Sequence, residues 1–317
     1  MPSMKSRMFV FMLQHMHLLQ GRLKRRAMIT WDTSIEEFRQ SASRGSKAFG
    51  KLPEGLAMEP VQIGEMYAEW IEPEGAARDR AILYCHGGGY VSGDCQSHRT
   101  HVAKFVTNSG IPALLFDYRL APEHPFPAAM EDALAAYRHL LDDGIAPERI
   151  VFAGDSAGGG LCLALLLAAR DEGLPLPGGA VGISPWTDLK CSSESRAARK
   201  KLDPLSPGEA WTVFGHYYAG DADRENPWIS PLYGDLAGLP PVLVVSGDHD
   251  ALFEDSPRFV DKAKAAGVDA TLHVGEGLFH CYPVCAPFFP EAQQAMDKIC
   301  AFFEAHTAAQ PALAETA

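Results

Sequence analysis

Residues 149–166 constrain the fold more than any other stretch, because they join an apolar segment, a glycine-rich turn and a helix-forming segment without interruption. Residues 150–153 (Ile-Val-Phe-Ala) favour a strand, residues 154–158 have the sequence Gly-Asp-Ser-Ala-Gly, and residues 161–170 favour a helix. A sharp strand-to-helix turn exposes the side chain at its apex, here Ser156, and the flanking glycines let the backbone bend without Cβ clashes. The pattern is typical of a serine nucleophile elbow. The alternative is a glycine-rich turn whose serine caps the helix.

Strand-like and helix-like segments alternate through most of the chain. The expected strands are 80–84, 111–116, 150–153, 179–183, 242–246 and 270–274, and the expected helices are 128–141, 161–170, 256–266 and 290–306. This alternation predicts an α/β fold, with a mostly parallel sheet, helices on both faces and ligands bound beyond the carboxyl ends of the strands. A hairpin over 58–71 is expected at the sheet edge. With 317 residues, the chain can form one large domain with an accessory piece.

Two stretches interrupt this alternation. Residues 188–230 are too long for a simple connection, so they predict an inserted cap with a helix at 207–218. Near the start of the chain, residues 34–49 predict a helix capped by Ser34, followed by a linker at 50–55.

The first 31 residues differ from the rest in charge. They contain six basic residues and no acid, so they carry +6; because the whole chain carries −12, the remainder carries −18. Apolar residues recur every three or four positions, at Met8, Met12, Met16, Leu19 and Leu23, which predicts an amphipathic helix. We expect the helix to pack over the rest of the protein, with the stripe Met8, Phe9, Met12 and Met16 either in that contact or lining the substrate pocket; a membrane-surface helix is the alternative. A secretory signal and a membrane-spanning helix are not predicted, because polar residues interrupt the short apolar run.

Charge and cysteine content narrow the classes of function. A net charge of −12 argues against a nucleic-acid-binding protein, because binding to phosphates needs a basic face. The seven cysteines are odd in number and scattered, which is typical of reduced thiols in a cytoplasmic protein rather than of a disulfide framework. The Cys and His residues lack zinc-finger spacing, so no structural metal is predicted.

A serine nucleophile needs a base that removes its proton and an acid that orients the base. His280 is the candidate base, because it follows the last expected strand, whereas His273 lies inside that strand and His249 lies in an earlier loop. Asp250, just past the strand at 242–246, is mildly favoured as the acid. The other carboxylates near strand ends are Asp188, Asp248 and Asp255.

A second glycine-rich segment, His-Gly-Gly-Gly at 86–89, follows the strand expected at 80–84. Consecutive glycines let backbone N–H groups converge on one point, as an oxyanion hole requires. With the N–H of Ala157, they would face the alkoxide that develops when a serine attacks a carbonyl group. A flexible glycine loop is the alternative. A phosphate-binding loop is not predicted, because the segment lacks the Lys-Ser/Thr of a P-loop.

Three segments together resemble the signatures of the hormone-sensitive-lipase-like esterases, the bacterial family IV carboxylesterases of the α/β-hydrolase fold. They are His-Gly-Gly-Gly at 86–89, Tyr-Arg-Leu-Ala-Pro-Glu-His-Pro-Phe-Pro-Ala-Ala at 118–129 and Gly-Asp-Ser-Ala-Gly-Gly at 154–159. The resemblance extends over roughly residues 30–305. It implies the α/β-hydrolase fold with a helical cap: residues 1–50 would form N-terminal cap helices, residues 51–317 the catalytic domain, and residues 188–225 within it a second cap segment.

The resemblance also implies roles for individual residues. Ser156 would be the nucleophile, His280 the base and Asp250 the acid of a Ser-His-Asp triad. The oxyanion donors would be the N–H groups of Gly88, Gly89 and Ala157. The segment 118–129 is expected to support the oxyanion loop, with one of its prolines in the cis form, and Asp155 is expected to support the site without touching substrate.

Two segments depart from the family's pattern. Residues 250–255 (Asp-Ala-Leu-Phe-Glu-Asp) stand where the family usually has Asp-Pro-Leu-x-Asp-Glu. They are closer to a branch resembling monoterpene lactone hydrolases and small acetyl esterases, in which a Glu often holds the acid position. His-Cys-Tyr at 280–282 replaces the usual His-Gly-Phe, which leaves the triad intact but bears on pocket shape and acyl preference.

The resemblance implies a serine carboxylesterase that hydrolyses short-chain acyl esters, or lactones, through an acyl-enzyme intermediate. Its partner would be a small-molecule ester substrate, with no metal or organic cofactor, no nucleic acid and no membrane insertion. Family members often dimerise through the last strand, so a homodimer is also implied. The alternatives are a non-catalytic small-molecule receptor on the same fold, an amidase and an interfacial lipase.

Overall fold

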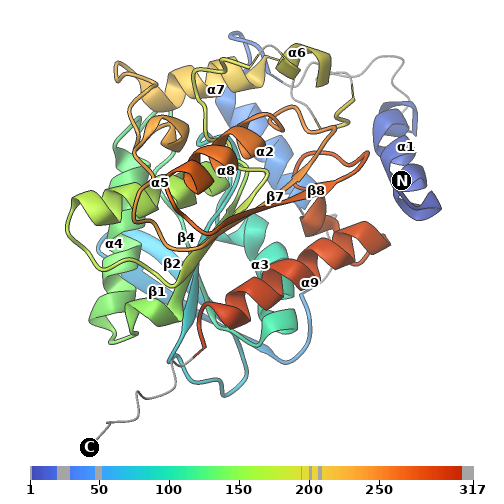
Figure 1. Cartoon of the computed structure of the whole chain (residues 1–317). Helices are drawn as coiled ribbons and strands as arrows, with labels where there is room; N and C mark the ends of the chain where they lie inside the picture. The colour runs from blue at the N-terminus through green and yellow to red at the C-terminus, as the bar shows by residue number, and fades with distance from the viewer. Residues whose placement is uncertain are drawn as a thin grey trace, which may run out of the picture.

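The computed structural model describes residues 2–19, 29–46, 52–193, 195–199, 202–205 and 209–308. In this part of the chain, eight strands form one sheet in the order β1-β2-β4-β3-β5-β6-β7-β8 (Figure 1). Strands β3 to β8 are parallel, and β2 is antiparallel to both of its neighbours. The strands are β1 (Leu56–Ile63), β2 (Met66–Pro73), β3 (Ala81–Cys85), β4 (Ala113–Phe116), β5 (Ile150–Asp155), β6 (Gly179–Ile183), β7 (Val242–Gly247) and β8 (Ala270–Gly275).

Helices cover both faces of the sheet. The helices are α1 (Met4–Leu19), α2 (Ile35–Ser46), α3 (Cys95–Ser109), α4 (Ala128–Asp142), α5 (Ala157–Asp171), α6 (Ser195–Arg199), α7 (Ala210–Ala219), α8 (Asp255–Ala265) and α9 (Pro290–Ala305). Helices α3 and α9 pack in one hydrophobic cluster, and α4, α5 and α8 pack in the cluster on the opposite face. Figure 1 shows α6 and α7 at the top of the molecule, with α2 running down from that end, and α7 packs in the same cluster as α4, α5 and α8.

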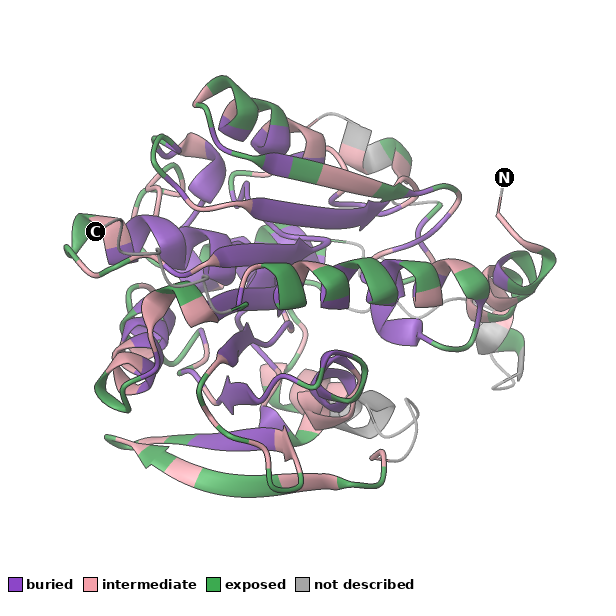
Figure 2. Cartoon of the chain, turned by 60° about the horizontal axis from the view of Figure 1, so that its bottom comes forward, coloured by how far each residue is buried: buried purple, intermediate pink, exposed green. Residues whose placement is uncertain are grey.

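The centre of the sheet is buried on both faces. Every residue of β3, β4, β5, β6 and β7 is buried, whereas the edge strand β1 has no buried residue (Figure 2). The central strands are nearly continuous runs of aliphatic residues, aromatic residues and glycine, a composition that suits a parallel sheet covered by helices on both sides. The fold therefore rests on two cores, one on each face of the sheet.

The strand–helix alternation predicted from the sequence is confirmed. The expected strands differ from the observed ones by at most two residues at either end, and the expected hairpin is β1–β2. Helix α5 begins at Ala157, earlier than the predicted residue 161, because glycines 158–160 continue the helix where it packs closely against β3 and the loop after β6. Both Ala121–Pro122 and Phe126–Pro127 are cis, where one cis proline was expected.

Helix α3 has no counterpart among the helices predicted from the sequence. Its Ser, His, Thr and Asn residues are weak helix formers, so its pattern gives little signal. Its ends supply the missing stabilisation. Asp94 and Ser97 form a reciprocal capping box, and Gly110 ends the helix in the left-handed conformation (φ 66°).

Helix α1 packs against the protein, but through only part of the apolar stripe predicted from the sequence. Met8 and Met12 are exposed, and the Met16 side chain lies outside the described residues. The packed residue of the stripe is Phe9, which contacts the rings of Phe279 and Phe289. The expected packing of the stripe is therefore confirmed for Phe9 and wrong for Met8 and Met12, because periodicity locates an apolar stripe but does not say which of its residues are covered. Among the described residues, no helix has the length and apolar character needed to cross a bilayer.

Helix α2 confirms the predicted cap at Ser34, whose hydroxyl accepts the Glu37 backbone N–H (3.3 Å). Arg39 extends from this helix to the main body: its guanidinium donates to the backbone carbonyls of Val91 (2.7 Å) and Ala121 (3.0 Å). Helix α7 begins at Ala210, so the first part of the helix expected at 207–218 lies outside the described residues. The boundaries at 50 and at 188–225 stay predictions.

A methyl group at Gly158 should loosen the contact between α5 and β3. An added Cβ would overlap the backbone carbonyl oxygens of Cys85 and His86, which cannot move without moving the strand end. We expect Gly158→Ala to lower the free energy of unfolding by about 1–3 kcal/mol, measured by urea denaturation. Gly173→Asn is the control, since nothing lies near its Cβ position and Asn tolerates the local φ of 70°. Equal stability of the two variants would contradict this account.

Candidate active site

Ser156 lies at the turn between β5 and α5. Its backbone has φ 56° and ψ −121°, a conformation that residues with a Cβ rarely adopt. The Ser156 N–H donates to the carbonyl of Ile183 in β6 (2.8 Å), and the Trp186 N–H donates to the carbonyl of Ser156 (2.9 Å). The segment from the end of β6 thus holds the turn in its strained form. The predicted strand, sharp turn and helix are all present.

Both ring nitrogens of His280 form hydrogen bonds. Nε2 lies 2.8 Å from Ser156 Oγ, and Nδ1 lies 3.0 Å from each carboxylate oxygen of Asp250. A carboxylate at Nδ1 favours the proton on that nitrogen, which leaves Nε2 to accept the serine hydroxyl hydrogen. His273 lies within β8 and His249 in the turn after β7, and neither ring bonds to Ser156 in the described part of the chain. The structure therefore brings Ser156, His280 and Asp250 together in one chain of hydrogen bonds.

The Asp250 carboxylate is buried and held by its own turn. It has no exposed surface, and its Oδ1 accepts the backbone N–H of Leu252 (2.8 Å). Burial alone would lower the pKa of His280, but the Asp250 carboxylate outweighs burial and raises that pKa well above its ordinary value. The pair is thus arranged to stabilise a positive charge on the imidazole.

A second buried carboxylate, Asp203, lies beside this pair. Its Oδ2 accepts the backbone N–H of Ala251 (3.1 Å) and its Oδ1 accepts that of Leu205 (2.9 Å). Burial, and then repulsion from Asp250, raise the pKa of Asp203 to about 6, while His280 acts in the opposite direction. Sequence reasoning missed this residue, because an Asp-Pro pair inside a charged connection carries no catalytic signature.

The other candidate acids have different partners. Asp188 forms an ion pair with Arg258 (3.0 Å), Asp248 accepts the backbone N–H of Gly277 (2.6 Å), and Asp255 accepts that of Asp188 (3.1 Å). Each therefore holds a neighbouring segment in place rather than contacting the imidazole. Sequence alone favoured Asp250 only mildly, because the positions of four carboxylates along the chain do not show which one faces His280.

The glycine loop after β3 lies against the serine turn. Gly88 (φ 119°) and Gly89 (φ 67°) adopt conformations that favour glycine, and a Cβ at Gly89 would overlap the Phe214 ring. The Gly87 N–H donates to Asp155 Oδ1 (3.1 Å), which ties the loop to the end of β5. No described residue accepts the N–H groups of Gly88, Gly89 and Ala157. These donors are available to a ligand.

The segment after β4 supports this loop from behind, as predicted. The Tyr118 ring stacks on His86 (centroids 4.0 Å apart), and its hydroxyl donates to the His86 backbone carbonyl (2.8 Å). Asp155 accepts a second hydrogen bond from the hydroxyl of Tyr84 (3.0 Å), so its carboxylate is occupied by protein donors. These contacts agree with a supporting role for Asp155, which stays a prediction as regards substrate.

Helix α7 places two aromatic residues at the site that sequence reasoning did not single out. The Trp211 ring stands edge-on to His280, with centroids 5.3 Å apart, and Phe214 contacts Gly89. Their spacing of three puts both on one face of the helix. That spacing was visible in the sequence, but it is equally typical of ordinary core packing. Among the described residues, no cluster of His, Cys, Asp and Glu could hold a metal ion.

Comparisons with known proteins agree with this fold. Residues 82–284 match the family described as having the α/β-hydrolase fold. An acetyl-hydrolase of Streptomyces hygroscopicus is 40% identical over 88% of this chain and 94% of its own length. A crystal structure of an esterase/lipase from an uncultured bacterium is 37% identical, covers 97% of this chain and all of its own, and superposes with a TM-score of 0.87. An esterase from the bacterial hormone-sensitive lipase family is 36% identical, with the same two coverages and the same TM-score. The chain therefore belongs to the bacterial hormone-sensitive-lipase-like esterases of the α/β-hydrolase fold.

Proposed function

We propose that this carboxylic ester hydrolase acts through a Ser-His-Asp triad made of Ser156, His280 and Asp250. The observation that carries the proposal is the continuous hydrogen-bond chain from the Ser156 hydroxyl through His280 to Asp250, at 2.8 and 3.0 Å. A serine hydroxyl becomes a good nucleophile only when a base takes its proton, and this chain supplies that base in the correct orientation. Relatives named acetyl-hydrolase and esterase support ester hydrolysis as the reaction.

The reaction would proceed in two steps. Ser156 Oγ attacks the ester carbonyl while His280 Nε2 takes the hydroxyl proton, and His280 then gives that proton to the departing alkoxide, so the alcohol leaves and an acyl-enzyme forms. In the second step His280 takes a proton from water as the water oxygen attacks the acyl carbon. The bond between the acyl carbon and Ser156 Oγ then breaks, His280 returns the proton to Oγ, and the acid departs. Asp250 stabilises the protonated imidazole in both steps but does not itself take the proton.

The N–H groups of Gly88, Gly89 and Ala157 would stabilise the oxyanion of each tetrahedral intermediate. Two features support this role. The loop and the serine turn touch each other, and Ala157 begins α5, whose first N–H groups have no acceptor within the helix. Removing one such donor typically costs about 3–4 kcal/mol of transition-state stabilisation.

The substrate would be a small-molecule ester with a short acyl group, and lactones fall within the same chemistry. Trp211 beside His280 and Phe214 against Gly89 occupy space next to the reacting atoms, which limits the room for a long chain. The name of the acetyl-hydrolase relative points the same way. The hydrogen bond between His280 and Ser156 argues against a non-catalytic receptor. A comparison of ester turnover with amide turnover distinguishes an esterase from an amidase.

We also propose that residues 1–50 and 188–225 act together as a cap on the catalytic domain, in a cytoplasmic protein. Helices α2 and α7 lie at the same end of the molecule in Figure 1, and both contact the segment that carries the glycine loop.

The edge strand β8 has a free side in the described chain, which is the side on which a second copy would pair to form a homodimer.

Asp203 would act on the reaction by positioning the acid rather than by touching substrate. It holds the backbone N–H of Ala251, the residue after Asp250, from the cap segment. Its carboxylate also adds negative charge next to the Asp250–His280 pair. Asp203 thus couples the placement of the cap to the pKa of the base.

Three substitutions test the triad. Ser156→Ala should reduce kcat by a factor on the order of 10⁶, and Asp250→Asn by about 10⁴ because the imidazole loses its orienting acceptor. Asp188→Asn should retain most of the activity, since that carboxylate pairs with Arg258 instead. The assay is hydrolysis of p-nitrophenyl acetate, with circular dichroism as the check on folding. Full activity of folded Ser156→Ala would rule out the nucleophile.

A series of p-nitrophenyl esters from acetyl to decanoyl tests the acyl preference. We expect kcat/KM to be highest for acetyl and butyryl esters and to fall with longer chains. Trp211→Ala should raise the decanoyl-to-acetyl ratio of kcat/KM, because it removes a ring that stands beside His280. Trp228→Ala, at a Trp whose indole N–H instead bonds to the exposed Asp171, is the control and should leave the ratio unchanged. A ratio insensitive to Trp211 would remove it from the pocket wall.

Asp203→Asn tests the role of Asp203 through the pH dependence of stability and activity. A carboxyl group whose folded pKa is about 6, above an ordinary value near 4, contributes stability below pH 4 that is lost as pH rises through 6. Asparagine does not titrate, so the variant does not lose this stability as pH rises. The difference in unfolding free energy, variant minus parent, should therefore increase between pH 4.5 and 7.5. The lost hydrogen-bond acceptor adds a cost that does not depend on pH. The acidic limb of kcat/KM should also move to lower pH. Asp261→Asn, at an exposed position of α8, should change neither, and matching profiles of the two variants would contradict the role.

A further inference from the structure

The outer side of α1 carries an exposed apolar stripe. The side chains that form it, called here the α1 apolar face, are Met4, Met8, Phe11, Met12 and Leu18, with exposed fractions of 79%, 66%, 62%, 41% and 51%. At 100° per residue these positions fall on one side of the helix. Soluble proteins rarely expose a continuous apolar patch of this kind unless it contacts something.

The orientation of α1 is fixed by its opposite side, so the exposed stripe is not a consequence of a detached helix. The Phe9 ring contacts Phe279, Phe288 and Phe289, with centroids 6.1, 5.9 and 5.1 Å away. Ser3 Oγ donates to the Glu291 carboxylate at the start of α9 (2.9 Å). With one side held in this way, rotation of the helix could not bury the α1 apolar face.

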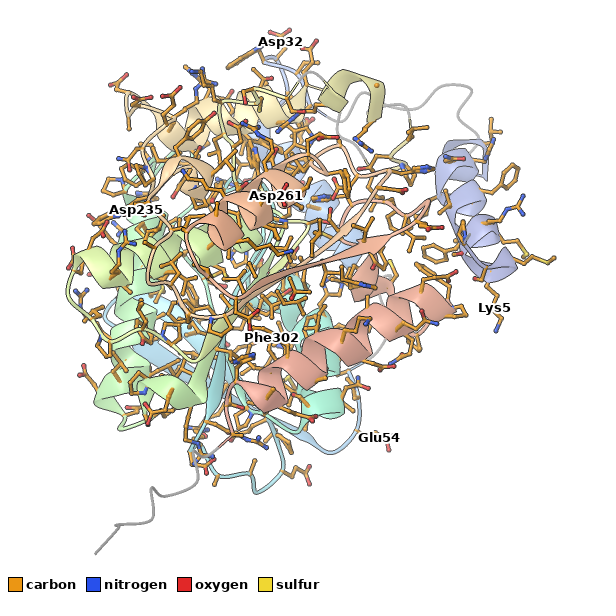
Figure 3. All side chains as sticks on the ribbon, viewed as in Figure 1. Lys5, Asp32, Glu54, Asp235, Asp261 and Phe302 are labelled. Atoms are coloured by element: carbon orange, nitrogen blue, oxygen red, sulfur yellow. The ribbon has the colours of Figure 1, made fainter. Side chains whose placement is uncertain are left out.

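Basic side chains border the stripe. By helical geometry, Lys5 lies at one margin of the α1 apolar face and Arg7 at the other, and both are exposed. Neither forms an ion pair with another described residue. Figure 3 shows Lys5 extending from α1 away from the body of the protein. The first 31 residues contain four further basic residues and no acid.

An apolar stripe with basic margins fits the surface of an anionic lipid bilayer. Such a helix lies in the membrane plane, with its apolar residues among the acyl chains and its cations at the headgroups. The rest of the chain carries −18, so an anionic surface attracts this end of the protein and repels the remainder, which selects one orientation. A symmetric contact with a second copy would instead place two sets of like charges against each other.

We propose that the α1 apolar face, with Lys5 and Arg7 at its margins, docks the protein onto the surface of anionic lipid bilayers. The protein rests on the bilayer without crossing it. Docking does not depend on the identity of the catalytic residues. It does place the catalytic loop close to the lipid surface, because Phe9 in α1 touches Phe279, the residue before His280.

Co-sedimentation of the full chain with lipid vesicles tests the proposal. We expect binding to vesicles of equimolar phosphatidylglycerol and phosphatidylcholine at low ionic strength, and much weaker binding to pure phosphatidylcholine or at high salt. Met8→Asp should weaken binding about tenfold, because a charge enters the apolar contact, and adding Phe11→Asp should abolish it. Lys5→Glu with Arg7→Glu should remove the preference for anionic lipid.

Met58→Asp is the matched control, since it places the same change at an exposed methionine of β1. It should leave vesicle binding unchanged and keep the parent's turnover of a soluble acetate ester, and all variants should keep the parent's melting temperature. Three results would overturn the proposal: no binding by the parent chain, equal binding to neutral and anionic vesicles, or equal loss in Met8→Asp and Met58→Asp. Light scattering that shows a dimer in the parent and a monomer in the Met8→Asp variant would assign the α1 apolar face to a second copy instead.

Discussion

The close approach of α5 to the end of β3 is the constraint on which the site depends. Because Gly158 has no Cβ, the first turn of α5 can rest on the carbonyls of Cys85 and His86. This contact brings two segments that lie far apart in the chain, the serine turn and the glycine loop, to the same point. A larger residue at 158 would separate the nucleophile from the N–H groups that we propose stabilise its oxyanion.

Much of the fold and part of the site could be predicted from the sequence, for identifiable reasons. Buried parallel strands have long apolar runs, and the serine turn has glycines at positions that backbone geometry requires, so both are visible locally. Helix α3 was not, because its stability comes from Asp94, Ser97 and Gly110 at its ends rather than from its interior. The exposure of Met8 and Met12 in the α1 stripe was not visible either, because only the tertiary contact of Phe9 shows which part of the stripe is covered.

The acid of the triad shows where local signals end. Four aspartates follow strand ends, and their order along the chain says little about which one faces the imidazole. The structure separates them by partners: Asp188 pairs with Arg258, whereas Asp250 contacts His280. Asp203 could not be found at all from its surroundings in the chain, because the residues beside it in space come from the turn after β7. Long-range proximity of like charges has no sequence pattern of its own.

The Arg39 guanidinium links α2 to the two segments that frame the glycine loop, through the carbonyls of Val91 and Ala121 and through an ion pair with Glu123 (2.7 Å). Hydrogen bonds therefore connect the amino-terminal region to the segments beside the catalytic centre. Proteolytic removal of the segment before β1 would take the hydrogen-bond donor away from the partly buried carbonyls of Val91 and Ala121. The glycine loop between them would then be held less firmly. Fusion tags or domain exchanges at that end of the polypeptide should accordingly be judged by their effect on turnover, not only by yield.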